Sequence, residues 1–350
     1  MRRSGCPARR SLPPTESGLI RPLSKFDSTL GYPGEGPRPL TLASRPGRDL
    51  RVTVKATTAR RYLQMLDRFA DWLARSQLPE LEQIVDTPAL LNAILVSYVQ
   101  TLYDQGLPFS WGSETLVGIQ FRWPATRGSL RPAWAVVSRW RTYEPIEMRV
   151  PMAVEVLLAL AVAARSLGWS RTAACLLLCF HLLLRPSEMA LALRRHLVLP
   201  GDTGGSALTG VFVVAKAKTS ERGGPRVQSV LLEDQSLLAV AAKEFASLPP
   251  TASLCPGQLR GLTERFKYLK QVTGLTNAPF TLASMRGGGA IHHFRTHQNL
   301  GLLQYRGRWE SAKSMQHYIQ MGSAALAYSQ LPADTQARVR ALADLAPNVF

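Results

Sequence analysis

Two arginines and two aromatic residues have the types and spacing that chemistry on a phosphate group requires. Arg185 ends an apolar run and precedes Glu188 by three positions, and Arg286 comes directly before three glycines. Trp309 and Tyr318 are nine residues apart. A guanidinium group binds phosphate oxygens through paired hydrogen bonds, an indole N–H adds a neutral donor, and a phenol oxygen is a nucleophile. These residue types together indicate a site for a phosphodiester.

The charge of the chain favours a polyanion as its partner. The 350 residues carry a formal net charge of +18, and the isoelectric point is near 10.4. Lysine and arginine neutralise phosphates and release counterions, so nucleic acid is a better candidate than an anionic membrane surface. Between residues 254 and 320 there are nine lysines and arginines but two acidic residues. We expect a basic surface here, with Arg306 and Arg308 among its DNA contacts.

Structural explanations compete with the chemical one at each position. Arg185 and Glu188 can simply pair and close a helix, while Trp309 and Tyr318 can both be core aromatics. Lys218, which ends the run AKAK, can be an exposed turn lysine. The order of these residues along the chain decides between the explanations.

Five residues occur in an order that resembles the catalytic domain of the tyrosine recombinases, the phage-integrase family: Arg185, Lys218, Arg286, Trp309 and Tyr318. In that family an R-x-x-E motif follows a helix, a lysine lies on a β-hairpin, and an H-x-x-R box comes later. A histidine or tryptophan then precedes the nucleophilic tyrosine by nine residues. Here RPSE, KTS and GRWESAKSMQHY supply the first, second and last of these features. The resemblance covers roughly residues 55–325, and it extends to the recombinases of eukaryotic mobile elements.

The expected chemistry needs no metal ion and no cofactor. Negative charge builds up on the non-bridging oxygens during cleavage, where Arg185, Arg286 and the indole N–H of Trp309 would stabilise it. Tyr318 would attack phosphorus and form a covalent 3′-phosphotyrosine, and Lys218 would protonate the leaving 5′-oxygen. By resemblance, the two domains would form a C-shaped clamp around double-stranded DNA, and four chains would assemble as a tetramer.

One position departs from the family pattern. The H-x-x-R box reads ASMR, so Ala283 stands where the family has a histidine that acts as an acid–base partner. His292 and His293 lie further along the chain and are not assumed to replace it. Glu188 is expected to orient Arg185 without itself contacting the phosphate. The glycines that follow Arg286 are expected to let the backbone approach a ligand closely.

The leading hypothesis is a site-specific DNA recombinase or integrase of a mobile element. One alternative is a domesticated DNA-binding protein that keeps the fold with impaired catalysis, which Ala283 would explain. Another is a topoisomerase that relaxes DNA without site preference. Tyr305 and Tyr328 are rival nucleophiles, but neither has the nine-residue spacing. The protein is expected in the nucleus of a eukaryote, or otherwise in the cytoplasm with the nucleoid.

Two other patterns are weaker signs of a function. His293 and His297 have the spacing of a zinc-binding helix, but HFRTH lacks the glutamate of H-E-x-x-H, so no metal site is expected. Residues 153–184 are apolar, but Arg165 and Arg171 divide them into two runs that are shorter than the ~20 residues of a membrane span. We therefore expect buried helices and no membrane association.

Changes in composition divide the chain. Residues 1–50 hold eight prolines and eight arginines without periodicity. We predict a disordered basic arm over 1–52, a helical core-binding domain over 53–142, a linker over 143–151, a catalytic domain over 152–330 and a C-terminal tail over 331–350. A helix in residues 323–350 is expected to pack on a neighbouring protomer, as such tails do in the family.

The predicted fold class is mainly α with a small β-hairpin or sheet, an α+β fold. Apolar positions Tyr62, Leu66, Phe69 and Leu73 recur at helical spacing, which leaves three arginines for the outer face as DNA contacts: Arg60, Arg61 and Arg68. Further helices are predicted at 88–103, 113–122, 132–142, 152–166 and 170–184, and from about 256 onward. The runs GVFVVAKAK and RVQSVLL alternate or are β-branched, which predicts a hairpin with Lys218 at its tip. Cys175 and Cys179 are predicted to be buried thiols.

Overall fold

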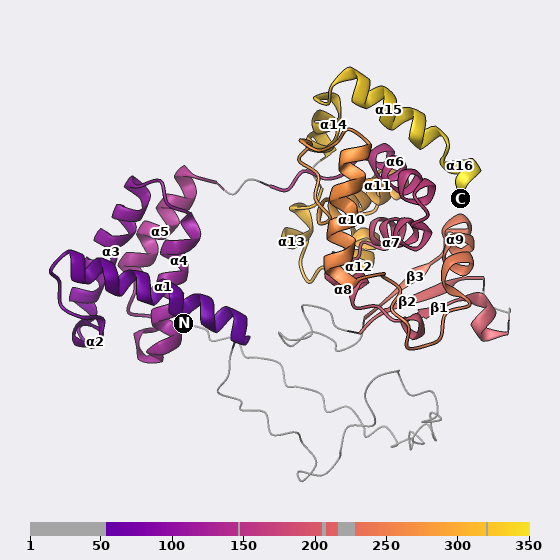
Figure 1. The fold of residues 1–350 in the computed structure, drawn as a ribbon. Coiled ribbons are helices and arrows are strands. Elements are labelled where there is room, and N and C mark those ends of the chain that lie inside the picture. Colours follow the sequence, from indigo (N-terminus) through magenta and orange to yellow (C-terminus); the bar gives the residue numbers. More distant parts are fainter. Residues whose placement is uncertain (1–53, 146–147, 205–207, 216–227, 320) are drawn as a thin grey trace, which may run out of the picture. The chain divides into compact units, whose positions relative to one another are not determined.

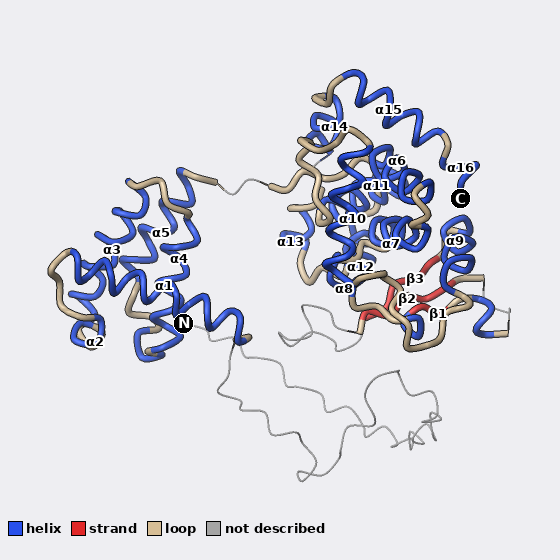
Figure 2. The backbone as a smooth tube through the Cα atoms, viewed as in Figure 1, coloured by secondary structure: helices blue, strands red, loops and turns tan. Residues whose placement is uncertain are grey.

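Helices make up most of the chain, and one small sheet lies among the C-terminal helices (Figure 1, Figure 2). The computed structural model describes residues 54–145, 148–204, 208–215, 228–319 and 321–350. This arrangement confirms the predicted α+β class with mainly α content.

The N-terminal helices have a hydrophobic cluster of their own. Leu66, Phe69 and Leu73 are buried in it, as their helical spacing predicted, while Tyr62 is half-buried. In chain order these elements are α1 (Ala56–Arg75), α2 (Leu81–Ile84), α3 (Pro88–Asp104), α4 (Phe109–Arg122), the 3-10 turn Pro124–Thr126 and α5 (Arg131–Tyr143).

The elements from residue 154 onward surround a larger core. They are α6 (Val154–Ser166), α7 (Ser170–His181), α8 (Pro186–Ala190), the 3-10 turn Arg194–His196, β1 (Leu197–Val198), the 3-10 turn Pro200–Thr203, β2 (Gly210–Val214), β3 (Gln228–Leu232), α9 (Gln235–Phe245), α10 (Gln258–Val272), α11 (Ser284–His297), α12 (Leu300–Gly307), α13 (Ala312–Gln316), α14 (Met321–Ser329), α15 (Ala333–Asp344) and α16 (Ala346–Val349).

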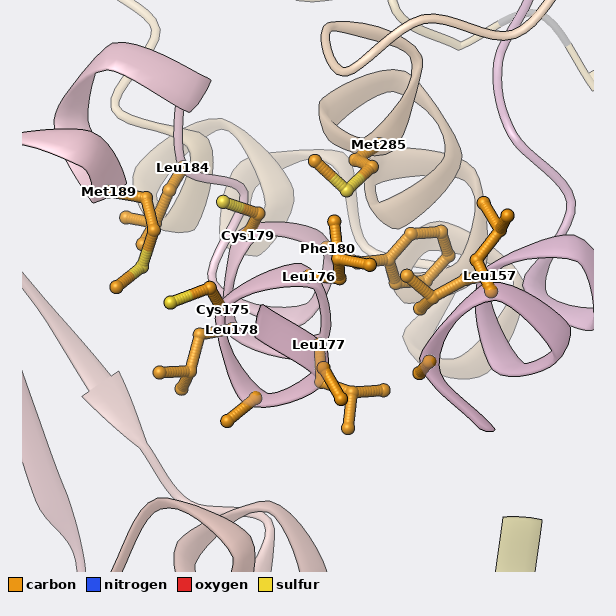
Figure 3. Packing of buried hydrophobic residues seen from close by; sticks show 14 of the residues in the cluster. Leu157, Cys175, Leu176, Leu177, Leu178, Cys179, Phe180, Leu184, Met189 and Met285 are labelled. Carbon is orange, nitrogen blue, oxygen red and sulfur yellow. The ribbon is translucent and has the colours of Figure 1, made fainter. Parts of the chain in front are cut away.

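Helix α7 is the central element of this core. It packs against α6, α8, α9 and α11, and all its residues from 172 to 180 are buried. Figure 3 shows Phe180 beside Met285 and Leu157, while Cys175 and Cys179 project from another side of the helix. A helix that is apolar on every face is one that other elements surround. The prediction of buried thiols is confirmed, since both cysteines are free and buried.

The sheet has three antiparallel strands in the order β1-β2-β3. Strands β2 and β3 form the predicted pair, with Phe212 opposite Val230. The first strand was not predicted, because two residues are too few to show an alternating pattern. Lys218, expected at the tip of the hairpin, belongs to residues 216–227 and lies outside the described residues.

The triple glycine was expected to let the backbone approach a ligand, but it lets α11 approach α7 closely instead. A Cβ at Gly288 would lie 2.0 Å from the carbonyl oxygen of Met152, and one at Gly289 would lie 2.0 Å from that of Phe180. Both glycines are in α11, and Phe180 is near the end of α7. The absence of side chains at these positions therefore sets the distance between α11, which contains Arg286, and α7, which ends shortly before Arg185.

Residues 331–350, expected as a tail, form α15 and α16 and pack against α6 of the same chain. Val339 in α15 is fully buried in the main core. The hydrophobic face of α15 is therefore already used within the chain, which differs from the expected packing on a neighbouring protomer.

Among the described residues, no helix is both long enough and apolar enough to cross a membrane.

The close contact at Gly288 gives a test of the packing. Gly288→Ala should lower the free energy of unfolding by about 1–3 kcal/mol, the usual range for overpacking. Gly287→Ala is the matched control, because its Cβ would meet Pro151 at 3.4 Å, an ordinary contact. It should be neutral or stabilise by about 0.4–1 kcal/mol. Urea denaturation followed by circular dichroism measures both effects, and equal losses would contradict the close packing of α11.

Candidate functional site

The carboxylate of Glu188 is the centre of the site. Its side chain is 1% exposed and lies in the short helix α8, which begins after Arg185. Oε1 accepts a hydrogen bond from Nη1 of Arg185 at 2.6 Å, and Oε2 accepts one from the backbone N–H of Arg185 at 2.9 Å. The R-x-x-E spacing thus closes the first turn of a helix and holds the arginine side chain at the same time.

Two further guanidinium groups approach this carboxylate from the C-terminal part of the chain. Nη2 of Arg308 lies 2.7 Å from Oε2 of Glu188, and Nη1 of Arg286 lies 3.9 Å from the same oxygen. The side chains of Arg286 and Arg308 are 3% and 7% exposed. We call Arg185, Arg286, Arg308 and Glu188 the arginine cluster. Its three cations and one anion leave a formal charge of +2 (three minus one).

Arg286 has hydrogen-bond donors without a partner. Its Nη2 donates to the backbone carbonyl of Gly307 at 2.5 Å, while Nε and Nη1 are buried and make no hydrogen bond. Burial, together with the charges of Arg185 and Arg308, lowers the pKa of Arg286, and Glu188 opposes this shift. A buried cation with unpaired donors is costly, and a bound anion would remove that cost.

Trp309 and Tyr318 lie close to the guanidinium group of Arg286. Its central carbon is 5.0 Å from the centre of the Trp309 ring and 5.6 Å from that of the Tyr318 ring. The two ring centres are 5.1 Å apart. Nε1 of Trp309 is buried without a hydrogen-bond partner, so the indole is a further unused donor. The nine-residue spacing therefore brings both aromatic side chains to Arg286.

Gly307 makes the position of Trp309 possible. A Cβ at residue 307 would lie 1.8 Å from a carbon of the Trp309 ring, so only glycine fits. Arg308 then has a φ of 56°, in the left-handed region, where α12 ends. Gly307 was not predicted to belong to the site, although a glycine so near a bulky residue at a helix end was an available signal. The partner of Arg308, which is 120 positions away, gave no signal in the sequence.

The remaining arginines that were predicted to contact DNA are in varied surroundings. On α1, Arg60 is exposed, Arg61 pairs with Glu114 at 2.9 Å, and Arg68 lies 3.7 Å above the ring of Trp111. These contacts leave the predicted DNA contacts of α1 untested.

Arg306 in α12 makes contacts within the protein. Nε donates to the carbonyl of His181 at 3.2 Å, and Nη1 lies 3.3 Å from a carboxylate oxygen of Glu233. Its side chain is 16% exposed. Arg306 therefore ties α12 to the end of α7 and the end of β3, and its predicted DNA contact remains a prediction.

Ala283 occupies the position where an acid–base histidine was expected, and His293 lies in α11, the helix that follows it. Ala283 is half-buried directly before α11, and its methyl group cannot exchange a proton. His293 is buried, and burial lowers its pKa to about 4. Its ring stacks near that of His297, with the centres 4.4 Å apart. No cluster of three or more metal-binding side chains occurs within the parts of the chain that the structure describes.

The rival tyrosines differ from Tyr318 in their surroundings. Tyr305 on α12 is 83% exposed, and Tyr328 on α14 packs against the main core, with its hydroxyl buried and without a hydrogen-bond partner. Tyr318 packs instead against the small cluster that contains Trp309. The arrangement around Tyr318 can hold an anionic phosphoryl group beside a phenol oxygen.

Comparison with known proteins gives distant likenesses among solved structures. No protein-family model matches the sequence, and no curated protein matches it at a significant level. A solved structure titled "Crystal structure of XerA recombinase" is similar, with a TM-score of 0.41 and 13% sequence identity over 77% of this chain and 98% of that chain. At this level of similarity we draw no functional conclusion from it.

Removal of the central carboxylate tests the arginine cluster. Glu188→Ala should lower the free energy of unfolding by about 3–5 kcal/mol, because it leaves buried cations without their anion. Glu264→Ala is the control, since Glu264 pairs with Arg260 at side chains that are 63% and 91% exposed. Such an exposed pair contributes about 0–1 kcal/mol. If chemical denaturation gives similar losses for the two variants, Glu188 does not hold the cluster together.

Proposed function

We propose that this protein binds double-stranded DNA and cleaves and rejoins its strands through a covalent bond between Tyr318 and a 3′-phosphate. The observation that carries this proposal is the position of the Tyr318 ring, 5.6 Å from a buried guanidinium carbon of Arg286. Two donors of that group have no partner, and the cluster around it has an excess of positive charge. The ordered motifs and the net charge of +18 support DNA as the source of the phosphate.

The reaction exchanges one phosphodiester bond for another. The Tyr318 oxygen forms a bond to phosphorus, the bond from phosphorus to the 5′-oxygen breaks, and that oxygen accepts a proton from Lys218. The phenolic proton passes to water, since Ala283 offers no acceptor. Religation reverses these steps, with a 5′-hydroxyl as the attacking group, so no external energy source is required.

The arginine cluster lowers the barrier by electrostatic stabilisation. Charge on the non-bridging oxygens increases in the transition state, where Arg185, Arg286 and the indole N–H of Trp309 donate hydrogen bonds to it. Loss of one such donor typically reduces the rate by about 10²–10³-fold. Glu188 contributes by holding Arg185 in place.

At a finer level we propose site-specific recombination or integration by a tetramer on two DNA sites. The runner-up is a DNA-binding protein of the same fold with impaired catalysis. The observation that favours it is Ala283, whose methyl group stands where the family has an acid–base histidine.

Substitution of the nucleophile gives the decisive test. Tyr318→Phe should abolish covalent capture of DNA while leaving DNA affinity nearly unchanged, because phenylalanine keeps the ring but lacks the attacking oxygen. The measurement is trapping on a pool of nicked, randomised duplexes, read on denaturing detergent gels. Tyr305→Phe is the matched control, because Tyr305 is exposed, and it should trap DNA as the unsubstituted protein does.

Other outcomes of this trapping experiment exclude specific proposals. Adducts with Tyr318→Phe would show that another residue is the nucleophile. If the unsubstituted protein binds DNA but forms no adduct, strand cleavage is excluded and the impaired DNA-binding protein is favoured.

The salt dependence of binding tests the predicted DNA contacts of α1. The logarithm of the binding constant should fall linearly with the logarithm of salt concentration, by about 0.9 per phosphate contacted. Arg60→Ala should reduce this slope by about 0.9 if the residue contacts one phosphate. Arg75→Ala on the same helix is the control and should leave the slope unchanged. A flat salt dependence for the unsubstituted protein would exclude nucleic acid as the partner.

A further inference from the structure

Arg308 has a backbone conformation that glycine adopts more easily than any residue with a side chain. Its φ of 56° is in the left-handed region, and it directly follows α12. Glycine is the usual residue there, and other residues pay about 1–2 kcal/mol of steric strain. A large charged residue at such a position needs a compensating role for its side chain.

The side chain of Arg308 is used to hold Glu188. Nη2 donates to Oε2 of Glu188 at 2.7 Å and also lies 3.4 Å from the carbonyl oxygen of Leu183. The same Oε2 accepts the backbone N–H of Arg185, and Oε1 accepts Nη1 of Arg185. Both oxygens of the carboxylate are therefore engaged by Arg185 and Arg308.

Arg286 is the third guanidinium group near this carboxylate, but it stands apart. Its Nη1 is 3.9 Å from Oε2 of Glu188, which is beyond hydrogen-bond distance, and this nitrogen has no hydrogen-bond partner. A shift of about 1 Å would turn this long ion pair into a charged hydrogen bond. An Arg286 that is paired with Glu188 would have less charge and fewer donors to offer a phosphate.

We propose that Arg308 is a positioning residue that holds Glu188 and thereby keeps Arg286 available for an anionic phosphoryl group. This inference rests on the proposed function, in which Arg286 contacts the phosphate. It goes further by assigning to Arg308 a role inside the protein rather than at the DNA surface. The donors that it keeps available are Nε and Nη1 of Arg286, which have no hydrogen-bond partner.

The proposal predicts a specific effect of charge. With Arg308 present, the cluster has a charge of +2 (three minus one). Arg308→Gln reduces it to +1 and lets Glu188 turn to Arg286. Adding Glu188→Gln restores +2 and removes the charged competitor of the phosphate, while the amide oxygen of glutamine can still accept a hydrogen bond from Arg185 and hold it in place.

The test uses inorganic phosphate and the full chain, so it does not depend on strand cleavage. Isothermal titration calorimetry at matched ionic strength, with chloride as the balancing anion, measures the affinity. Arg308→Gln should bind phosphate at least about tenfold more weakly, the scale of one charged hydrogen bond. The double variant Arg308→Gln with Glu188→Gln should recover affinity to within about threefold of the original protein. Arg308→Lys, which keeps the charge, should bind more tightly than Arg308→Gln.

Arg165→Gln is the matched control, because it also removes one positive charge and one partly buried ion pair. Arg165 lies 3.0 Å from Glu244, at side chains that are 22% and 10% exposed. Its phosphate affinity should equal that of the original protein. Thermal unfolding of every variant establishes that each is folded at the temperature of the titration.

The outcomes separate this inference from the proposed function. A double variant that binds as weakly as Arg308→Gln, or more weakly, would overturn the positioning role, and so would an unchanged affinity in Arg308→Gln. A phosphate affinity too weak to measure in the original protein would overturn it as well. Recovery in the double variant would support the inference even if the trapping experiment finds no adduct, in which case only strand cleavage fails.

Discussion

The carboxylate of Glu188 is 1% exposed, and guanidinium groups from three parts of the chain surround it. A buried carboxylate is costly unless cations and other donors satisfy its oxygens. For that reason α8, the start of α11 and the turn after α12 have to meet at one point. Once they meet there, the excess of cations over anions makes the same point attractive to an anion. The contacts that stabilise the fold here therefore also produce the local excess of positive charge.

The backbone around this point accepts strain in order to bring these groups together. Leu183, in the turn between α7 and α8, has a φ of 52°, and Arg308 has a φ of 56°. Each conformation costs about 1–2 kcal/mol for a residue with a side chain. The Leu183 side chain is fully buried beside Trp309, and Arg308 pairs with Glu188, so packing and charge offset the strain. Strained residues of this kind are frequent at functional sites.

The sequence predicts the local elements far better than it predicts their partners. Helical periodicity identified α1, an apolar run identified α7, and alternation identified the pair of β2 and β3, because these patterns depend on near neighbours. The motif order also predicted that Arg286, Trp309 and Tyr318 would meet. By contrast, the three glycines were assigned to a ligand, although Gly288 and Gly289 face the backbone of Met152 and Phe180. That contact joins residues more than 100 positions apart, and no periodic pattern reports it.

Sequence patterns do not report distant contacts, which also explains why the partners of Arg308 and of residues 331–350 were not predicted. An arginine in a basic segment is equally consistent with a DNA surface and with a buried ion pair, and only the position of Glu188 separates these alternatives. The family resemblance predicted that a helix in residues 323–350 packs on a neighbouring protomer, but the sequence does not state whether its partner is that protomer or α6 of the same chain. Charge and the family resemblance indicate that a contact exists, and the tertiary fold determines which one forms.

Access to the site follows from the burial of its donors. Nε and Nη1 of Arg286 and Nε1 of Trp309 are all buried, whereas the side chain of Arg185 is 23% exposed. An anion from solvent can therefore contact the side chain of Arg185, whereas contact with Arg286, which is 3% exposed, requires a rearrangement of the groups that bury it. Trp309 belongs to a cluster with five buried members, against which the partly buried Tyr318 packs, and this cluster is much smaller than the main core. Because less apolar surface is buried there, moving the aromatic pair costs less free energy than disturbing α7 or α11. The Tyr318 ring thus packs in a part of the fold that rearranges at a lower free-energy cost than the main core.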